Sequence, residues 1–141
     1  MISTLLEFLS GKADTATIVI NICVLAFVVI CCLPVHESAH AWMADKLGDS
    51  TGRLQGRISL NPAAHFDLIG TLMLVFLGFG YAKPVPVNIH NFPPKKQKLY
   101  FGLTAVAGPI SNILLSILFL LLKNIVIVVY AKAPMPQNVA Q

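Results

Sequence analysis

Two histidines and a glutamate form the pattern His36-Glu37-Ser38-Ala39-His40 in the first third of the chain. Residues four apart on a helix lie on the same face, about one turn apart along the axis, so both imidazoles can reach one divalent ion. The pattern His-Glu-x-x-His supplies two zinc ligands together with a carboxylate. We therefore predict that His36 and His40 bind Zn²⁺, and that Glu37 is the general base that takes a proton from an attacking water.

The element that must position this pattern is apolar. Residues 17–35 read TIVINICVLAFVVICCLPV, which is long enough to cross a bilayer. We expect one helix over residues 14–47, with Asp14 as its N-cap and Gly48 as its stop. Pro34 should free a carbonyl one turn earlier and bend the helix, which helps open a wet pocket beside the motif. Ionisable side chains at the end of such a helix would be costly without a function.

The composition places the chain among integral membrane proteins. Its 141 residues allow one domain, 1–141, and combine 56% hydrophobic with only 11% charged residues at a mean hydropathy of +0.76. The net charge of +4 comes largely from basic residues that flank apolar segments, where they orient spans and meet lipid headgroups. We expect a lipid bilayer and no nucleic acid among its partners.

Cysteine does not complete the metal site in this sequence. Cys23, Cys31 and Cys32 lie within one apolar stretch and lack the spacing of a metal knuckle, so we interpret them as small buried residues. Cys32 shares a face with the histidines. It lies about two turns, roughly 12 Å, from His40 along the axis, whereas zinc bonds are only about 2.0 to 2.3 Å long.

Two shorter segments follow the motif helix. Residues 53–60, RLQGRISL, alternate between polar and apolar side chains, which predicts a strand. An open strand edge near the metal could hold an unwound substrate, and an interfacial loop that merely covers the site explains the segment equally well. Residues 68–81 are apolar but too short for a full crossing, so we expect a re-entrant or tilted segment.

The last apolar run, 99–122, predicts a second membrane helix, and apolar residues continue beyond it. Its small-residue stripe should face the motif helix, with Asn112 hydrogen-bonding near the metal or acting as a packing amide. That stripe consists of Gly102, Ala105, Pro109 and Asn112. At the two ends we expect a short interfacial helix over 1–10, which is not a cleavable signal by pattern, and a frayed polar tail over 133–141.

The predicted fold is an α-helical integral membrane protein. It has two long transmembrane helices (14–47 and 99–122), one short or re-entrant apolar segment (68–81) and a small strand (53–60) near the active site. Lysines crowd the Pro-rich loop after the short segment and belong on the cytoplasmic side. They are Lys83, Lys95, Lys96 and Lys98. If the short segment doubles back, the metal site opens near the cytoplasm.

The motif and its membrane helix resemble the site-2 protease family of intramembrane zinc metalloproteases. A prokaryotic branch is closer still, through HESAHAWMADKLGDSTGRLQGRISLNPAAHFDLIGT, GFGYAKPVPVN and AGPISN at residues 107–112. The resemblance covers roughly 31–122. It implies zinc on His36 and His40, Glu37 as general base, transmembrane proteins as substrates and a prokaryotic cell membrane as the location.

One feature of the family pattern is missing. Members usually supply a third zinc ligand from an Asp-Gly motif on a later helix, and this sequence has no Asp-Gly and no acidic residue after Asp67. Either the chain is truncated, or another residue serves, with Asp67 and His65 as weak candidates, or the protein is inactive. Asp67 is equally suited to cap the following helix.

Three functions therefore compete. The first is a zinc endopeptidase that cuts in or near membrane-spanning segments. The second is a catalytically inactive, protease-like membrane protein with a structural or partner-binding role, which the missing Asp-Gly favours. A metal permease is the least favoured of the three functions. A permease needs ionisable groups along a path through the membrane, whereas those of this chain cluster at one level. The sequence does not fix the substrate, the cleavage site or the oligomeric state.

Overall fold

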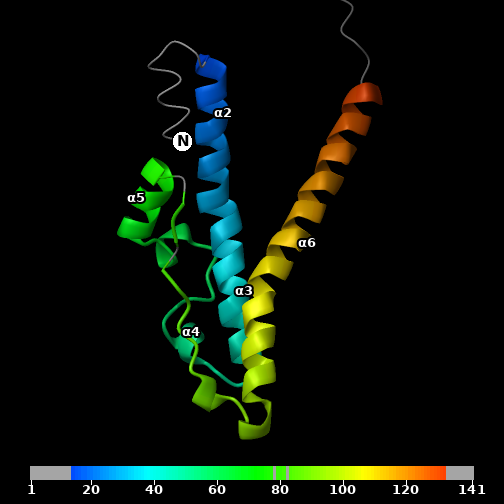
Figure 1. Cartoon of the computed structure of the whole chain (residues 1–141). Helices are drawn as coiled ribbons and strands as arrows, with labels where there is room; N and C mark the ends of the chain where they lie inside the picture. The colour runs from blue at the N-terminus through cyan, green and yellow to red at the C-terminus, as the bar shows by residue number, and fades with distance from the viewer. Residues whose placement is uncertain (1–13, 78, 82, 133–141) are drawn as a thin grey trace, which may run out of the picture.

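The computed structural model describes residues 14–77, 79–81 and 83–132. Most of these residues are helical, and two helical rods are long and apolar enough to cross a membrane, Thr15–Lys46 with a hydropathy of 3.0 and Pro94–Ala131 with 2.6. The rods run side by side in their lower halves and diverge above (Figure 1). The interfacial helix expected over 1–10 and the tail expected over 133–141 lie outside the described residues.

The first rod consists of α2 (Thr15–Phe27), a five-residue π-helical turn (Val28–Cys32) and α3 (Leu33–Lys46), without a break. The predicted N-cap is confirmed, because the Asp14 carboxylate accepts a hydrogen bond from the backbone N–H of Thr17 at 2.8 Å. The predicted stop is confirmed as well. The chain leaves the helix through Gly48 at φ 114°, a conformation that side chains disfavour.

The π-helical turn lies where Pro34 was expected to disturb the helix. Proline lacks an N–H and its ring clashes with the carbonyl four residues earlier, so the regular hydrogen-bond ladder cannot continue through it. The N–H of Leu33 donates instead to the carbonyl of Val28, five residues back. Such turns widen a helix locally and are frequent at functional sites. Here the widened turn lies one helical turn before His36.

The predicted strand over 53–60 is wrong, and the described residues contain no strand. A short helix, α4 (Thr51–Leu54), is followed by a turn through Gly56 at φ 69°. The alternation of polar and apolar residues is misleading here because Arg57 is buried, with 5% of its surface exposed. Its guanidinium group donates hydrogen bonds to the backbone carbonyls of Ala64 (2.6 Å) and Lys83 (3.4 Å). A buried arginine that binds backbone carbonyls thus occupies a position that the pattern assigned to the polar face.

The short apolar segment forms α5 (Leu68–Leu77), ten residues long. The chain then returns to where α5 began, because the N–H of Lys83 donates to the carbonyl of His65 at 3.0 Å. Helix α5 and the segment that follows it lie so close together that a Cβ on Gly70 would collide with the backbone carbonyl of Tyr81. The segment therefore doubles back, which is one of the two arrangements, re-entrant or tilted, that its length left open. Figure 1 shows α5 on the side of α2 away from the second rod.

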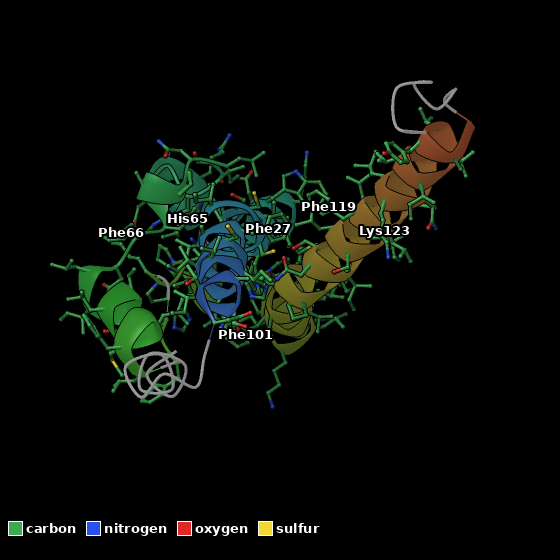
Figure 2. All side chains as sticks on the ribbon, turned by 90° about the horizontal axis from the view of Figure 1, so that it is seen from above. Phe27, His65, Phe66, Phe101, Phe119 and Lys123 are labelled. Atoms are coloured by element: carbon green, nitrogen blue, oxygen red, sulfur yellow. The ribbon has the colours of Figure 1, made fainter. Side chains whose placement is uncertain are left out.

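The second rod is α6 (Gln97–Lys132), 36 residues long and therefore ten residues longer at its C-terminal end than predicted. It packs along α3 through small side chains, and Ala107 is 8% exposed. Farther up, Phe27 of α2 and Phe119 of α6 meet edge to face with ring centroids 5.1 Å apart (Figure 2). Apolar side chains facing outward on both rods suit a lipid surround.

One carboxylate ties the lower ends of the two rods together. Asp49, fully buried after α3, accepts hydrogen bonds from the side chain of Thr51, from the backbone N–H of Asn88 (2.7 Å) and from the side chain of Asn91 (2.7 Å). Burial alone would raise the pKa of Asp49, but the hydrogen bonds from Thr51, Asn91 and Asn88 outweigh it, and the pKa is lowered from its ordinary 3.8. This network fixes the loop that leads into α6.

We predict that Asp49→Ala destabilises the folded protein by roughly 2–3 kcal/mol, because buried donors lose a charged acceptor. Thermal unfolding in detergent measures the effect. The matched control is Asp45→Ala, which removes an Asp45 to Arg53 ion pair of 2.9 Å at the surface and should change stability by less than about 1 kcal/mol. The contribution of Asp49 should be complete above pH 3.8 and disappear as pH falls through its lower folded-state pKa. Equal losses in both variants would contradict this account.

Candidate metal centre

The two motif histidines converge, as the sequence predicted. His36 and His40 lie on the same side of α3, with their Nε2 atoms 3.1 Å apart and their ring planes 82° apart. Two nitrogens bound to one tetrahedral zinc at about 2.0 to 2.1 Å would be about 3.3 Å apart. The observed spacing is therefore close to that of two ligands of a single zinc ion.

Helix α6 holds both rings from the other side. Nδ1 of His40 lies 2.7 Å from the carbonyl oxygen of Thr104. A carbonyl only accepts, so Nδ1 carries the proton and the neutral ring presents the Nε2 lone pair. Metal-binding histidines commonly anchor their second nitrogen in this way. The side-chain amide of Asn112 reaches Nδ1 of His36 at 3.2 Å, and an amide can offer either a donor or an acceptor to that nitrogen.

Gly108 keeps the space between the two imidazoles free. A Cβ on Gly108 would lie 2.7 Å from Nε2 of His36 and closer still to Nε2 of His40. Any larger residue at this position would therefore collide with both rings that are to hold a shared ion. Thr104, Gly108 and Asn112 are spaced by four residues, so one face of α6 supplies the carbonyl, the gap and the amide.

Two features of these residues fit a zinc ion. The two imidazoles supply suitable donor nitrogens, and Gly108 has no side chain that would collide with their rings. They do not complete a catalytic set of three protein ligands. Residues 14–77, 79–81 and 83–132 contain no group of three or more histidine, cysteine, aspartate or glutamate side chains that could hold a metal ion.

Neither weak candidate for the third ligand joins the pair. The carboxylate of Asp67 caps α5, where it accepts from the backbone N–H of Gly70 at 2.8 Å. His65 points its Nε2 at the carbonyl oxygen of Ser59 at 2.7 Å. Asp67 therefore has the capping role that the sequence offered as the alternative, and His65 is held by the loop after α4.

A cavity of about 790 Å³ opens beside the histidine pair. Glu37 lines it next to His36 and His40, and the opposite wall comes from α5 and the extended segment that follows it. Most of the lining is apolar, as in sites that take up small molecules or apolar peptide segments. The cavity therefore has a carboxylate and two imidazoles at one end and an apolar wall elsewhere.

The loop that covers the motif helix is anchored by the motif itself. The hydroxyl of Ser38 donates to the carbonyl of Ser59 and accepts from the N–H of Ser59 at 3.1 Å. Ser38 occupies a position at which the His-Glu-x-x-His pattern allows any residue, so the sequence did not predict its hydrogen bonds to Ser59. Ser38, which lies between the two motif histidines, thus fixes the neighbouring loop.

The small-residue stripe predicted on α6 is only partly right. Asn112 does meet the motif helix, but a Cβ on Gly102 would have nothing within 4 Å, and Pro109 is exposed. The observed contact face consists of Thr104, Ala107 and Gly108 instead. The Ala-Gly-Pro-Ile-Ser-Asn run at 107–112, which carries the family resemblance, contains two of these three residues, Ala107 and Gly108.

We predict that Gly108→Ala lowers zinc affinity by at least about tenfold, because its methyl group would collide with both imidazoles and push them out of position. Gly102→Ala is the matched control on the same helix and should leave zinc affinity unchanged. The measurement is competitive zinc titration of detergent-purified protein. Equal zinc affinity in the two variants would show that the ion does not bind at this place.

Comparison with known proteins supports a zinc peptidase relationship. The chain is 45% identical over 92 residues, 65% of its length, to a Bacillus subtilis (strain 168) protein named "Putative zinc metalloprotease YwhC". The match covers 41% of that protein, so the chain spans about two fifths of the length of this relative. No family model matches the chain, and no solved structure matches it. The chain is therefore similar in sequence to a protein named as a zinc metalloprotease.

Proposed function

We propose that this chain is the zinc-binding part of an endopeptidase that hydrolyses peptide bonds in or near membrane-spanning segments. The observation that carries the proposal is the pair of imidazole nitrogens 3.1 Å apart, with Glu37 on the wall of the adjoining cavity. The name of the relative agrees with it. Two apolar rods of membrane-spanning length support a position within the bilayer.

The residues have separate tasks in this mechanism. His36 and His40 would hold the zinc ion, with the Thr104 carbonyl and the Asn112 amide fixing their rings. Zinc, when bound, lowers the pKa of water and polarises a carbonyl group. Glu37 accepts the proton of the attacking water and later delivers it to the nitrogen of the leaving amine. The proton balance closes, because one hydroxyl and one hydrogen of the water end on the two products.

The surroundings of the site fit a buried substrate. A helix within the bilayer satisfies its own N–H and C=O groups, so it must unwind before a peptide bond can be attacked. The largely apolar cavity can accept the side chains of such an unwound segment. We also propose the site-2 protease family, transmembrane protein substrates and a prokaryotic cell membrane. Lys95 and Lys96 directly before α6, and Lys98 in its first turn, support a site that opens toward the cytoplasm.

A second function remains a candidate because of one specific observation. The described residues offer two imidazoles and no third side chain that could join them as a metal ligand. A protein of this kind could keep the fold and the histidine pair without catalysis, and act as a structural or partner-binding membrane protein. Catalytic zinc sites generally use three protein ligands, so activity requires a ligand from outside the described residues.

We predict that Glu37→Gln lowers cleavage of a model transmembrane substrate by at least about 100-fold while the bound zinc stays the same. The amide has the shape of the carboxylate but cannot take a proton. Asp45→Asn is the matched control, since Asp45 lies on the same helix and pairs with Arg53. Cleavage by Glu37→Gln at the wild-type rate would contradict the assigned base. Zinc binding without cleavage by the wild type would favour the inactive alternative.

A further inference from the structure

Asn112 and the two motif histidines form one continuous chain of close polar contacts. At one end the carbonyl oxygen of Thr104 lies 2.7 Å from Nδ1 of His40. Nε2 of His40 lies 3.1 Å from Nε2 of His36, and Nδ1 of His36 lies 3.2 Å from Nδ2 of Asn112. Each of these contacts needs one donor and one acceptor. The position of every proton in the chain therefore follows from the end that is fixed.

The fixed end is the carbonyl oxygen of Thr104, because a carbonyl only accepts. Nδ1 of His40 donates to it, so Nε2 of the same ring carries a lone pair. The contact between the two Nε2 atoms then requires a proton on Nε2 of His36. In a neutral ring, which the largely apolar surroundings favour over a charged one, Nδ1 of His36 is left as an acceptor. Asn112 meets this acceptor with its NH2 group.

A zinc ion requires another arrangement of the same protons. Nε2 of His36 binds a metal only through its lone pair, so the proton of the neutral ring must then lie on Nδ1. An N–H at Nδ1 does not pair with the NH2 group of Asn112, because both are donors. The distance of 3.1 Å between the Nε2 atoms suits a hydrogen bond and is also close to the spacing of two ligands on one zinc ion. The rings can therefore stay in place while the proton moves.

The partner for the second arrangement is the other end of the same amide. Oδ1 of Asn112 is buried and makes no hydrogen bond, although buried polar side-chain atoms are nearly always paired. The two ends of an amide group have nearly the same shape, so half a rotation exchanges them within the same space. Oδ1 then accepts the proton on Nδ1 of His36 and gains the partner that it lacks. A carboxylate could only accept, and an alkyl side chain could do neither.

We propose that Asn112 is a positioning residue that follows the proton of His36. Its NH2 group donates to Nδ1 while the two imidazoles share a hydrogen bond, and its oxygen accepts from Nδ1 when Nε2 binds zinc. In this change one proton leaves Nε2 for water and one is taken up at Nδ1, so the ring stays neutral. Both rings line the cavity, which gives water a route to them. The inference rests on the proposed function, which needs zinc on these two histidines.

The test is ¹⁵N NMR of the detergent-purified full chain with labelled histidine, recorded without metal and again after zinc is added. The ¹⁵N signal of a ring nitrogen shows whether that nitrogen carries a proton. The chain has only four histidines, and the signals of His36 are those that His36→Ala lacks. The variants are Asn112→Asp, whose carboxylate only accepts, and Asn112→Leu, which does neither. Asn124→Leu, at an exposed position of the same helix, is the matched control.

In the wild type we expect Nδ1 of His36 to carry no proton before zinc is added and to carry one afterwards. Asn124→Leu should give the same result. In Asn112→Asp, Nδ1 should carry a proton in both samples, because the carboxylate holds it there. Asn112→Leu should bind zinc at least about tenfold more weakly than the wild type, as is usual when a ligand loses the partner of its second nitrogen. Thermal unfolding checks that each variant is folded.

The wild-type spectra decide the matter even if a variant does not fold. A proton on Nδ1 of His36 before zinc is added, or none on it once zinc is bound, would overturn the inference and leave the zinc site standing. Spectra of folded Asn112→Asp that match the wild type in both samples, or unchanged zinc affinity in folded Asn112→Leu, would overturn it as well. If zinc alters no histidine signal of the wild type, the pair does not bind the ion, and the proposed function falls together with the inference.

Discussion

The candidate site depends on how closely α6 approaches the histidine face of α3. Gly108 lets the backbone of α6 come within contact of both Nε2 atoms, and no residue with a side chain fits there. The same approach brings the Thr104 carbonyl to His40 and the Asn112 amide to His36. One helix contact thus sets the position of the rings, the tautomer of His40 and the space between the two nitrogens. A shift of α6 along its axis would disturb all three together.

The remainder of the fold maintains that contact. Asp49 joins the end of α3 to the loop before α6, and its carboxylate is fully buried with its hydrogen bonds made. Ser38 and Arg57 hold the loop after α4 against α3 by binding backbone groups. These polar groups lie at the lower ends of the rods, whereas the upper halves are apolar and diverge (Figure 1). The chain therefore concentrates its specific polar bonds around the end that carries the motif.

Local signals in the sequence predicted local structure well. Asp14, Pro34 and Gly48 act on neighbouring backbone groups or on their own backbone. The first rod begins at Asp14 and ends at Gly48 as predicted, and its regular hydrogen bonding is interrupted before Pro34 by a π-helical turn, where a bend was predicted. The convergence of His36 and His40 follows from the helical period alone. The length of 68–81 predicted a segment too short for a full crossing, and it left open whether that segment doubles back or is tilted.

Features that depend on distant partners could not be predicted in the same way. The alternation at 53–60 resembles a strand, but Arg57 binds carbonyls that come from later parts of the chain. The contact face of α6 was misplaced because small residues lie all around that helix and only the position of α3 selects among them.

The most direct measurement of the central claim is X-ray absorption spectroscopy at the zinc edge on the loaded protein. A single ion held between the two rings predicts two imidazole nitrogens in its coordination shell at about 2.0 to 2.1 Å, and weaker imidazole scattering in His36→Ala, where only His40 remains. A zinc ion without imidazole ligands, or an identical spectrum in His36→Ala, would contradict the account.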